Sequence, residues 1–408
     1  MANALTVWWD GNIVGSLVVD RYGDTTFAYS EDWLTSPHAR AISQSLPLRR
    51  EPFSRRQSRP FFEGLLPEEN QRIAVARALG LSPENEFRLL EKLGGEIAGA
   101  LSLWPEGQDP PQTGASEADA RPLSDSDLIA ILDQLPTRPM LAGREGLRLS
   151  LAGAQTKLPI VVTDAGIALP TPGQPTTHIL KPAIERFPGT VENEAFAMRL
   201  ARDIGLSVAN TALRSINGRP VLLVERYDRV RNADGTVKRL HQEDFCQALG
   251  VPSSRKYAAD GGPTFRDCFT LLRSSATRPA REVLKLFDTA VFNLIIGNAD
   301  AHGKNYSLIY RETGIEMAPL YDLLSTVVYP ELSTNLAMKV ARRATLEELQ
   351  SRDWKRFAEE TGLTEPYIRR RARALAEEVQ AKADGIRLSE DCAELVKGRA
   401  TQLLRLLD

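Results

Sequence analysis

Cysteine is scarce in this sequence, which has only Cys246, Cys268 and Cys392 among 408 residues. The three lie far apart, are odd in number and lack C-x-x-C spacing, which argues against structural disulfides and a cysteine-based zinc site. No uninterrupted apolar run is long enough to cross a bilayer, and the first residues lack the pattern of a signal peptide. We therefore expect a cytoplasmic protein with no membrane association.

An excess of charge of one sign is also lacking. The formal net charge of -2 does not indicate a chain that binds nucleic acid by itself, although a basic patch can occur on a protein whose total charge is near zero. With 42% hydrophobic and 25% charged residues, the composition is that of a globular protein, and 408 residues suffice for two or three domains.

The first third of the chain contains both strand and helix patterns. The apolar runs 5–9 and 13–19 flank Asp10-Gly11, which predicts a hairpin, and residues 26–29 read as a further strand. The spacing of apolar residues over 67–92 predicts a helix. Its expected buried face consists of Ile73, Val75, Ala76 and Leu79.

The segment from Pro105 to Pro122 contains four prolines and two glycines and is expected to be an exposed linker. Strands and short helices mix after it. Residues 281–297 then read as a long buried helix, and the chain from about residue 346 is helical in pattern. The predicted divisions are a β-rich subdomain at 1–105, a linker at 106–122, an N-lobe at 123–230 and a helical C-lobe at 231–408. This predicts a two-lobed α/β (α+β) protein, with the cleft between lobes as the default ligand site.

The strongest chemical signal follows the predicted helix 281–297. Asp300 is followed five residues later by Asn305, then by a strand-like run, and Asp322 comes seventeen residues after Asn305. This is the kinase arrangement, in which the first Asp accepts the substrate hydroxyl proton and the Asn and second Asp hold Mg²⁺ on ATP. A lone Asp-x₄-Asn is more often a turn cap, but the flanking helix, strand and second Asp favour the kinase interpretation. In that interpretation His302 and Lys304 face the phosphates; otherwise they are solvated loop residues.

Three weaker segments precede it. The small residues after Ser150 can cradle phosphate oxygens, although neither a Walker A nor a G-x-G-x-x-G motif is present. Lys181 ends an apolar strand and can reach the α/β-phosphates. The backbone of Glu225, Arg226 and Tyr227, where another strand ends, can bind the adenine edge. A small-residue turn, a surface lysine and an ordinary strand end are the respective alternatives, and the order of the four segments is what favours a kinase.

At these residues the sequence resembles the HipA family of bacterial toxin kinases. The matching stretches lie within about residues 140–330 and include SLAGAQTKLPI, TTHILKP, LVERYDR, HQEDFCQALGVPSSRKYAADGGP, LIIGNADAHGKNYSLIY and MAPLYD; FFEGLLPEE at 61–69 also matches. The resemblance implies a fold related to protein kinases, with an added N-terminal β-rich subdomain and an all-helical C-terminal lobe. It implies a serine/threonine kinase that phosphorylates an aminoacyl-tRNA synthetase, such as glutamyl-tRNA synthetase, to arrest growth and cause persistence. It further implies neutralisation by a HipB-type helix-turn-helix antitoxin, and repression of the pair's operator DNA mainly through that antitoxin.

Carried over by position, the resemblance implies Asp300 as the catalytic base and Asn305 and Asp322 as the metal ligands. Ser150 matches an autophosphorylated serine whose modification ejects the phosphate loop. The residues implied to hold the nucleotide are Ala152, Gly153, Ala154, Gln155, Thr156, Lys157, Lys181, Glu225, Arg226, Tyr227, His302, Gly303, Lys304, Asn305, Tyr321 and Asp322.

Two departures from the family pattern are visible. Thr156 stands where an acidic residue is common, and the basic run 369–373 matches no known DNA contact, so direct DNA binding stays open. The rival interpretation is a catalytically silent corepressor that binds an antitoxin and DNA. A degenerate catalytic loop would favour that interpretation, but the predicted catalytic loop is complete. A small-molecule kinase is a third, but such enzymes do not carry the Ser150 loop in this form.

Overall fold

The computed structural model of the protein describes residues 3–111 and 120–408. The chain forms two compact units, Met1–Pro182 with Arg214–Ser253, and Ala183–Leu213 with Ser254–Asp408. Part of the predicted linker, residues 112–119, lies outside the described residues. No helix in the described ranges is long and apolar enough to cross a membrane.

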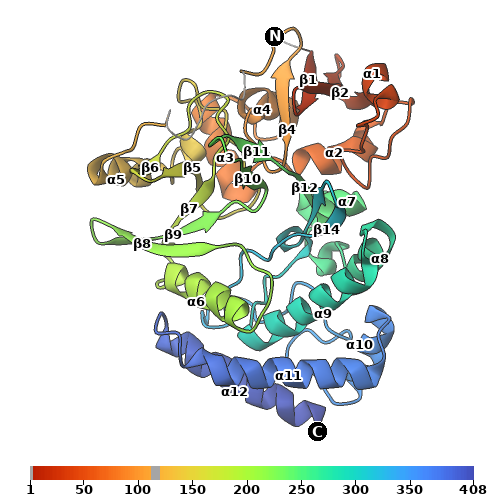
Figure 1. The fold of residues 1–408 in the computed structure, drawn as a ribbon, viewed down its shortest axis with the longest axis vertical. Helices are drawn as coiled ribbons and strands as arrows, with labels where there is room; N and C mark the ends of the chain where they lie inside the picture. Colours follow the sequence, from red (N-terminus) through yellow and green to blue (C-terminus); the bar gives the residue numbers. More distant parts are fainter. Residues whose placement is uncertain (1–2, 112–119) are drawn as a thin grey trace. The chain divides into compact units, whose positions relative to one another are not determined.

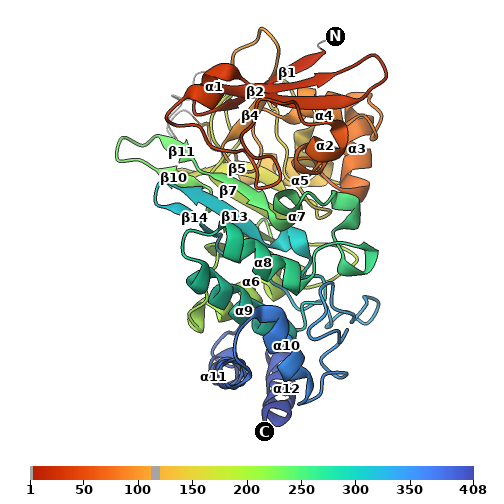
Figure 2. The same cartoon turned by 90° about the vertical axis from the view of Figure 1, so that its right-hand side faces the viewer.

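The first unit begins with a four-stranded antiparallel sheet (Figure 2). Its strands, in spatial order, are β3 (Thr25–Tyr29), β2 (Asn12–Val19), β1 (Ala4–Trp9) and β4 (Leu101–Pro105). Asp10 and Gly11, with φ of 45° and 76°, join β1 to β2, so the hairpin predicted at this Asp-Gly pair is confirmed. Leu5, Val7 and Phe27 are fully buried and give this sheet its core.

Helices α1 (Glu31–Thr35), α2 (Arg55–Glu63), α3 (Glu69–Leu79) and α4 (Glu86–Leu93) connect β3 to β4. The single helix predicted over 67–92 is wrong, because Gly80 adopts a left-handed φ of 66° that ends α3, and Asn85 caps the start of α4. Ile73, expected to be buried, is 49% exposed, whereas Val75 and Ala76 are buried. The pattern predicted the helical type of the segment but not its break.

A second sheet follows in the order β6 (Gly166–Ala168), β5 (Leu158–Thr163), β7 (His178–Pro182), β9 (Arg219–Glu225) and β8 (Thr211–Ile216). Helix α5 (Asp125–Gln134) and a 3-10 turn, η2 (Pro139–Leu141), precede it. Leu158, Leu180 and Leu222 are fully buried in its core. The rest of the unit consists of the ribbon β10 (Arg229–Arg231) and β11 (Val237–Arg239), the strand β12 (His241–Asp244) and helix α7 (Phe245–Leu249).

The second unit is mostly helical (Figure 1). The long apolar helix predicted over 281–297 is present as α9 (Pro279–Ile296), which packs against α8 (Phe265–Ser275), α11 (Glu365–Ala383) and α12 (Glu390–Leu407). Helices α6 (Thr190–Asp203) and α10 (Asp353–Thr361) complete the set, together with the short 3-10 turns η3 (Ser253–Arg255), η4 (Ala258–Asp260) and η5 (Gly303–Asn305). The hairpin β13 (Ser307–Arg311) and β14 (Gly314–Met317) directly follows η5, where the sequence predicted a strand.

Candidate active site

The segment that carries Asp300 leaves the end of α9 through Gly297. This glycine has a left-handed φ of 70°, and a Cβ there would lie 2.3 Å from Val327 Cγ2, so a larger residue would be strained and would collide. Thr326 N–H donates to the Gly297 carbonyl at 3.0 Å, and the Thr326 hydroxyl accepts from Ala299 N–H at 2.8 Å. The turn that presents Asp300 is therefore fixed on the side of residues 326–327.

Within the second unit, the structure brings the three predicted chemical residues into one loop system. Asn305 Nδ2 donates to Asp322 Oδ2 at 2.9 Å, and Asn305 Oδ1 accepts from His302 N–H at 3.2 Å. His302 N–H also donates to the Asp300 carbonyl at 2.7 Å. Asn305 thus makes the turn contact expected of an ordinary Asx residue and also reaches the second aspartate, which a simple turn cap would not require.

Asp322 has a left-handed φ of 59°, a conformation that costs energy for most side chains but that Asp tolerates better than most. Its surroundings hold it there: Asn193 in α6 donates to Ser325 O and accepts from Ser325 N–H, both at 2.8 Å. The adjacent Tyr321 donates its hydroxyl to Lys304 O at 2.7 Å and lies 2.8 Å from the Ser307 hydroxyl. These contacts tie the Asp322 turn to α6 and to the loop 302–307.

The oxygen atoms of Asp322 and Asn305 fit Mg²⁺, which prefers hard oxygen ligands and is usually bound through one or two carboxylates together with substrate phosphates. In the described ranges, no cluster of three or more His, Cys, Asp or Glu side chains is placed to hold a metal ion. The donor set therefore suits a metal that arrives with a phosphate ligand better than a resident metal caged by protein.

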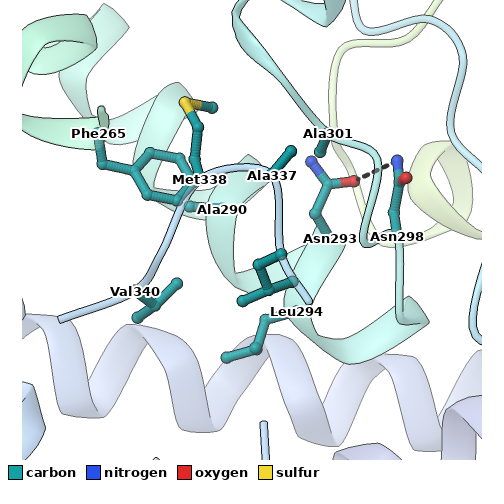
Figure 3. Close-up of a pocket in the computed structure, with 10 residues that line it drawn as sticks. Phe265, Ala290, Asn293, Leu294, Asn298, Ala301, Ala337, Met338 and Val340 are labelled. Atoms are coloured by element: carbon teal, nitrogen blue, oxygen red, sulfur yellow. Dashed lines mark hydrogen bonds between the residues drawn. The ribbon is translucent and has the colours of Figure 1, made fainter. Parts of the chain in front are cut away.

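A small pocket lies beside the loop that carries Asp300 (Figure 3). It has room for about one water molecule and is lined by Asn293, Asn298 and apolar side chains such as Phe265 and Met338. Asn298 Nδ2 donates to Asn293 Oδ1 at 3.1 Å, and Asn293 Nδ2 donates to the buried Tyr306 hydroxyl at 3.1 Å. This network braces the loop from inside, on the side of α9.

The other predicted residues of this loop differ in exposure. His302 and Lys304 are buried, at 7% exposed each, so the alternative that they are solvated loop residues is wrong. Gly303 begins η5. Asp300 is exposed.

In the first unit, the predicted phosphate loop is a compact turn between Ser150 and β5. Lys157 Nζ donates to Ala152 O at 2.7 Å, which closes the loop on itself. Gly153 has a φ of 110°, a backbone conformation that glycine adopts without strain and that other residues rarely adopt. Ala154 is exposed at the tip, with Gln155 and Thr156 partly exposed beside it.

Residues 65–71 of the N-terminal region hold this loop. The fully buried Ser150 donates its hydroxyl to Leu65 O at 2.7 Å, Glu68 N–H donates to Gly153 O at 3.3 Å, and Gln71 Nε2 donates to Thr156 Oγ1 at 3.0 Å. The loop position therefore depends on a segment that is more than 80 residues away in the sequence.

Lys181 lies near this loop through strand pairing. Leu158 in β5 pairs with Leu180 in β7, so Lys157, which precedes β5, and Lys181, which follows Leu180, stand at the same level of neighbouring strands. Lys181 is 6% exposed, so the alternative that it is a plain surface lysine is wrong. Two cations at one end of the sheet suit a polyphosphate.

The segment 225–227 follows β9. Arg226 N–H donates to Thr177 O at 2.9 Å, so this donor is already used within the sheet. Glu225 is exposed, and the Tyr227 hydroxyl bonds the side chain of Gln242. The other backbone groups of residues 225–227 would therefore have to bind an adenine edge.

The side chain of Arg226 enters a buried ionic cluster of Glu96, Arg226, Asp228, Arg229 and Arg239. Glu96 Oε1 lies 3.0 Å from Arg226 Nη1 and 2.8 Å from Arg229 Nη2, and Glu96 Oε2 lies 2.5 Å from Arg239 Nη2. Burial alone would raise the pKa of Glu96, but the three guanidinium groups lower it to about 2. Burial likewise opposes ionisation of Asp228, and Arg226 and Arg229 nevertheless lower the pKa of that carboxyl.

Glu96 also supports the phosphate loop through its backbone. Its N–H donates to Arg148 O at 2.8 Å, and its carbonyl accepts from Ser150 N–H at 2.9 Å. One residue thus connects the start of the loop with the segment 226–229. No sequence pattern marks this residue, because a lone Glu in the stretch 94–99 has no partner close to it along the chain.

A second residue missed in the sequence is Tyr257, whose hydroxyl donates to Asp300 Oδ1 at 2.9 Å within the second unit. It lies in a stretch that matches the HipA pattern, HQEDFCQALGVPSSRKYAADGGP, but no known catalytic spacing points to it.

The chain is similar to several known proteins. Sequence profiles of the HipA N-terminal domain and the HipA-like C-terminal domain match residues 5–104 and 149–384. Protein Y4mE of Sinorhizobium fredii is 59% identical over 96% of this chain and 93% of its own length. The serine/threonine-protein kinase toxin HipA of Shewanella oneidensis is 34% identical over 96% of this chain and 92% of its own length.

Among solved structures, the complex of Shewanella oneidensis HipA, HipB and their operator DNA contains a chain that matches with a TM-score of 0.83. The match has 30% identity and covers 99% of this chain and 96% of that one. It confirms the predicted fold class, a mixed α/β kinase-like fold with a β-rich N-terminal part and a helical C-terminal region. With both domain profiles matched and the similarity extending over nearly the full length, the chain belongs to the HipA family.

Proposed function

We propose that the protein is an ATP- and Mg²⁺-dependent serine/threonine kinase that acts as the toxin of a toxin–antitoxin pair. The observation that carries this proposal is the Asp300, Asn305 and Asp322 loop system, in which Asn305 is bonded both to the turn after Asp300 and to Asp322. This is the residue set that a kinase needs to accept a hydroxyl proton and to anchor a metal–phosphate group.

In the proposed reaction, the oxygen of a substrate serine bonds to the γ-phosphorus of ATP as the bond from that phosphorus to the β–γ bridging oxygen breaks and ADP leaves. The carboxylate of Asp300 takes the hydroxyl proton. Asn305 and Asp322 would hold Mg²⁺, which supplies positive charge against the phosphate oxygens when bound. Most of the rate comes from positioning and electrostatics, because phosphoryl transfer requires little covalent work from the protein.

We propose that the backbone of residues 152–156, with Lys157 and Lys181, binds the phosphates, and that the backbone of 225–227 binds the adenine edge. His302, Gly303, Lys304 and Tyr321 would contribute from the second unit. The support comes from each unit separately. In the first unit, residues 152–157 form a tight loop near Lys181, and in the second unit His302 and Lys304 are buried.

For the substrate, we propose an aminoacyl-tRNA synthetase, such as glutamyl-tRNA synthetase, whose phosphorylation in the cytoplasm would arrest translation and growth and lead to persistence. A HipB-like helix-turn-helix antitoxin would neutralise the kinase and bring it to operator DNA. The support is the full-length similarity to a HipA toxin, together with the structural match to a HipA chain solved with HipB and operator DNA.

The arginine-rich run of α11 supports DNA contact mainly through the antitoxin. Arg371 pairs with Asp288 at 2.7 Å, Arg373 with Asp408 at 2.6 Å and Arg369 with Glu365 at 2.9 Å. Arg370 lies over the Tyr367 ring at 5.6 Å. Three of the four arginines are thus neutralised within the second unit, so they present little net positive charge to a phosphate backbone.

Incubation of the purified protein with γ-labelled ATP, Mg²⁺ and a bacterial lysate tests the proposal. We expect one or a few lysate proteins to be labelled on serine, and the Asp322→Ala variant to label none, because a metal ligand is lost. A wild type that labels nothing would instead favour the rival function, a catalytically silent corepressor.

Growth provides an independent readout. Overexpression without a partner should stop growth, and the Asp322→Ala variant, expressed to the same level, should restore it because phosphate transfer is lost. Colony counts after induction measure both. Equal toxicity of the two proteins would point to a mechanism that does not depend on catalysis.

Self-modification at Ser150 is a further expected property. A phosphate adds a charge of about -1.5 to -2 and cannot occupy the buried position now bonded to Leu65 O, so the loop must leave when it is added. Mass spectrometry after incubation with Mg²⁺–ATP should find a phosphate on Ser150 of the wild type and none in the Asp300→Asn variant. An enzyme at full turnover with Ser150 unmodified would contradict this switch.

A further inference from the structure

We propose that Tyr257 is a positioning residue for phosphate transfer, acting through the carboxylate of Asp300. The Tyr257 hydroxyl donates to Asp300 Oδ1 at 2.9 Å, although the two residues are 43 positions apart in the sequence. This inference rests on the proposed role of Asp300 as the base. It adds a residue from a separate segment, the stretch between α7 and α8, to the machinery of the catalytic loop.

The backbone of this segment is fixed to the catalytic loop. Ala258 N–H donates to Ala337 O at 3.2 Å, and Ala337 N–H donates to Ala299 O at 2.7 Å. Ala337 therefore joins the residue after Tyr257 to the residue before Asp300, beside the small pocket in Figure 3. Two backbone hydrogen bonds set the spacing between the tyrosine and the aspartate, so their contact is not an accident of two mobile side chains.

A tight turn behind Tyr257 also holds it in place. Gly262 N–H donates to Tyr257 O at 2.9 Å, and a Cβ on Gly262 would lie 2.1 Å from Arg255 O and 2.6 Å from Tyr257 O. No larger residue fits there without moving the backbone. Gly262 is therefore required by the close approach of the backbone at Arg255 and Tyr257.

The ring of Tyr257 is contacted on two sides. The His302 ring meets it edge-on with centroids 5.2 Å apart, and Lys256 Nζ lies 5.4 Å from its centroid. These contacts involve the ring and not the hydroxyl, so a phenylalanine at this position would keep them. The hydroxyl can therefore be tested separately from the packing.

The chemistry that follows concerns the two oxygens of Asp300. A donor on Oδ1 helps to fix the plane of the carboxylate that must accept the substrate proton. Removing the donor has two opposing effects: the carboxylate becomes a stronger proton acceptor, and it also loses one of the contacts that hold it in line. We expect the loss of alignment to have the larger effect on the rate of phosphate transfer, because kinase catalysis depends mainly on positioning and little on the strength of the base.

Tyr257→Phe tests the proposal. Initial rates of phosphate transfer from γ-labelled ATP to the lysate protein that the wild type labels, measured against ATP concentration, give an apparent kcat and a KM for ATP. We expect kcat to fall about ten- to a hundredfold, the range for losing a hydrogen bond to a charged group, while KM changes less than about twofold. Tyr367→Phe, which removes a hydroxyl in α11 of the same unit, should leave both constants within about twofold.

The double variant Tyr257→Phe/Asp300→Asn separates a positioning role from a general structural one. If Tyr257 acts through Asp300, its loss should cost nothing more once the carboxylate is gone. An active wild type whose Tyr257→Phe variant has the same kcat would overturn this inference and leave the proposed kinase function intact. A wild type that transfers no phosphate, or an Asp300→Asn variant with full activity, would remove the proposed function or base and this inference with it.

Discussion

Asp300→Asn should reduce phosphate transfer by about 10²–10⁴-fold, the usual contribution of a positioned general base. The amide keeps the shape of the side chain and can still accept the Tyr257 hydroxyl, but it cannot take up the substrate proton. Binding of Mg²⁺–ATP should stay within about twofold of the wild type, because Asn305 and Asp322 are unchanged. Transfer is measured with γ-labelled ATP and binding by titration calorimetry.

Asp267→Asn is a matched control for this prediction. Asp267 is an exposed aspartate of the same unit, where it completes the capping box of α8 with Thr264. The substitution should cost stability of up to about 1 kcal/mol at the cap but leave kcat unchanged. Self-labelling by Asp300→Asn at the wild-type rate would show that another group accepts the proton.

Glu96→Gln should lower the free energy of unfolding of the first unit by about 3–5 kcal/mol, because it leaves three buried guanidinium groups with one carboxylate. Urea unfolding followed by tryptophan fluorescence suits this measurement, since Trp8, Trp9, Trp33 and Trp104, four of the five tryptophans, lie in the first unit. Because Glu96 also supports Ser150 and the segment after β9, nucleotide affinity should fall as well.

The exposed pair Arg50–Glu31, with side chains 75% and 61% exposed, provides the control. Glu31→Gln should change stability by less than about 1 kcal/mol. The pH dependence gives a second check: the pKa of Glu96 is lowered from 4.5 to about 2 on folding, so its contribution is complete above about pH 4.5 and is lost as the pH falls toward 2. The difference between the wild type and Glu96→Gln should therefore be constant near neutrality and shrink below pH 4.5; a difference under 1 kcal/mol at pH 7 would contradict the role of the cluster.

The parts of the fold that sequence predicted are those whose cause is local. Asp10-Gly11 specifies a turn through its own backbone preferences, and the apolar run of α9 needs no partner to be recognised as a buried helix. The order Asp300, Asn305, Asp322 could be read because a short loop and one hairpin bring the three together. The apolar spacing alone does not predict the break between α3 and α4, because it continues on both sides of Gly80 and Pro83.

The parts that could not be predicted depend on long-range contacts between unrelated segments. Glu96 meets Arg226, Arg229 and Arg239 across more than 125 residues, and Tyr257 meets Asp300 across 43. These residues do not alter the hydrophobic pattern of their own segments, so neither periodicity nor a motif predicts the contacts. Only the folded chain shows that Asp300 and the predicted phosphate loop each have a supporting residue from another part of the protein.

The burial of Ser150 has a consequence for the lifetime of an active molecule. Its hydroxyl is covered while Leu65, Glu68 and Gln71 hold the loop, so under the proposed self-modification the loop would have to open before Ser150 receives a phosphate. The rate of self-inactivation would then follow how often the loop opens and not how fast phosphate is transferred. Substitutions in residues 65–71 would shorten the time for which each molecule stays active. They would do so without changing an atom that takes part in phosphate transfer.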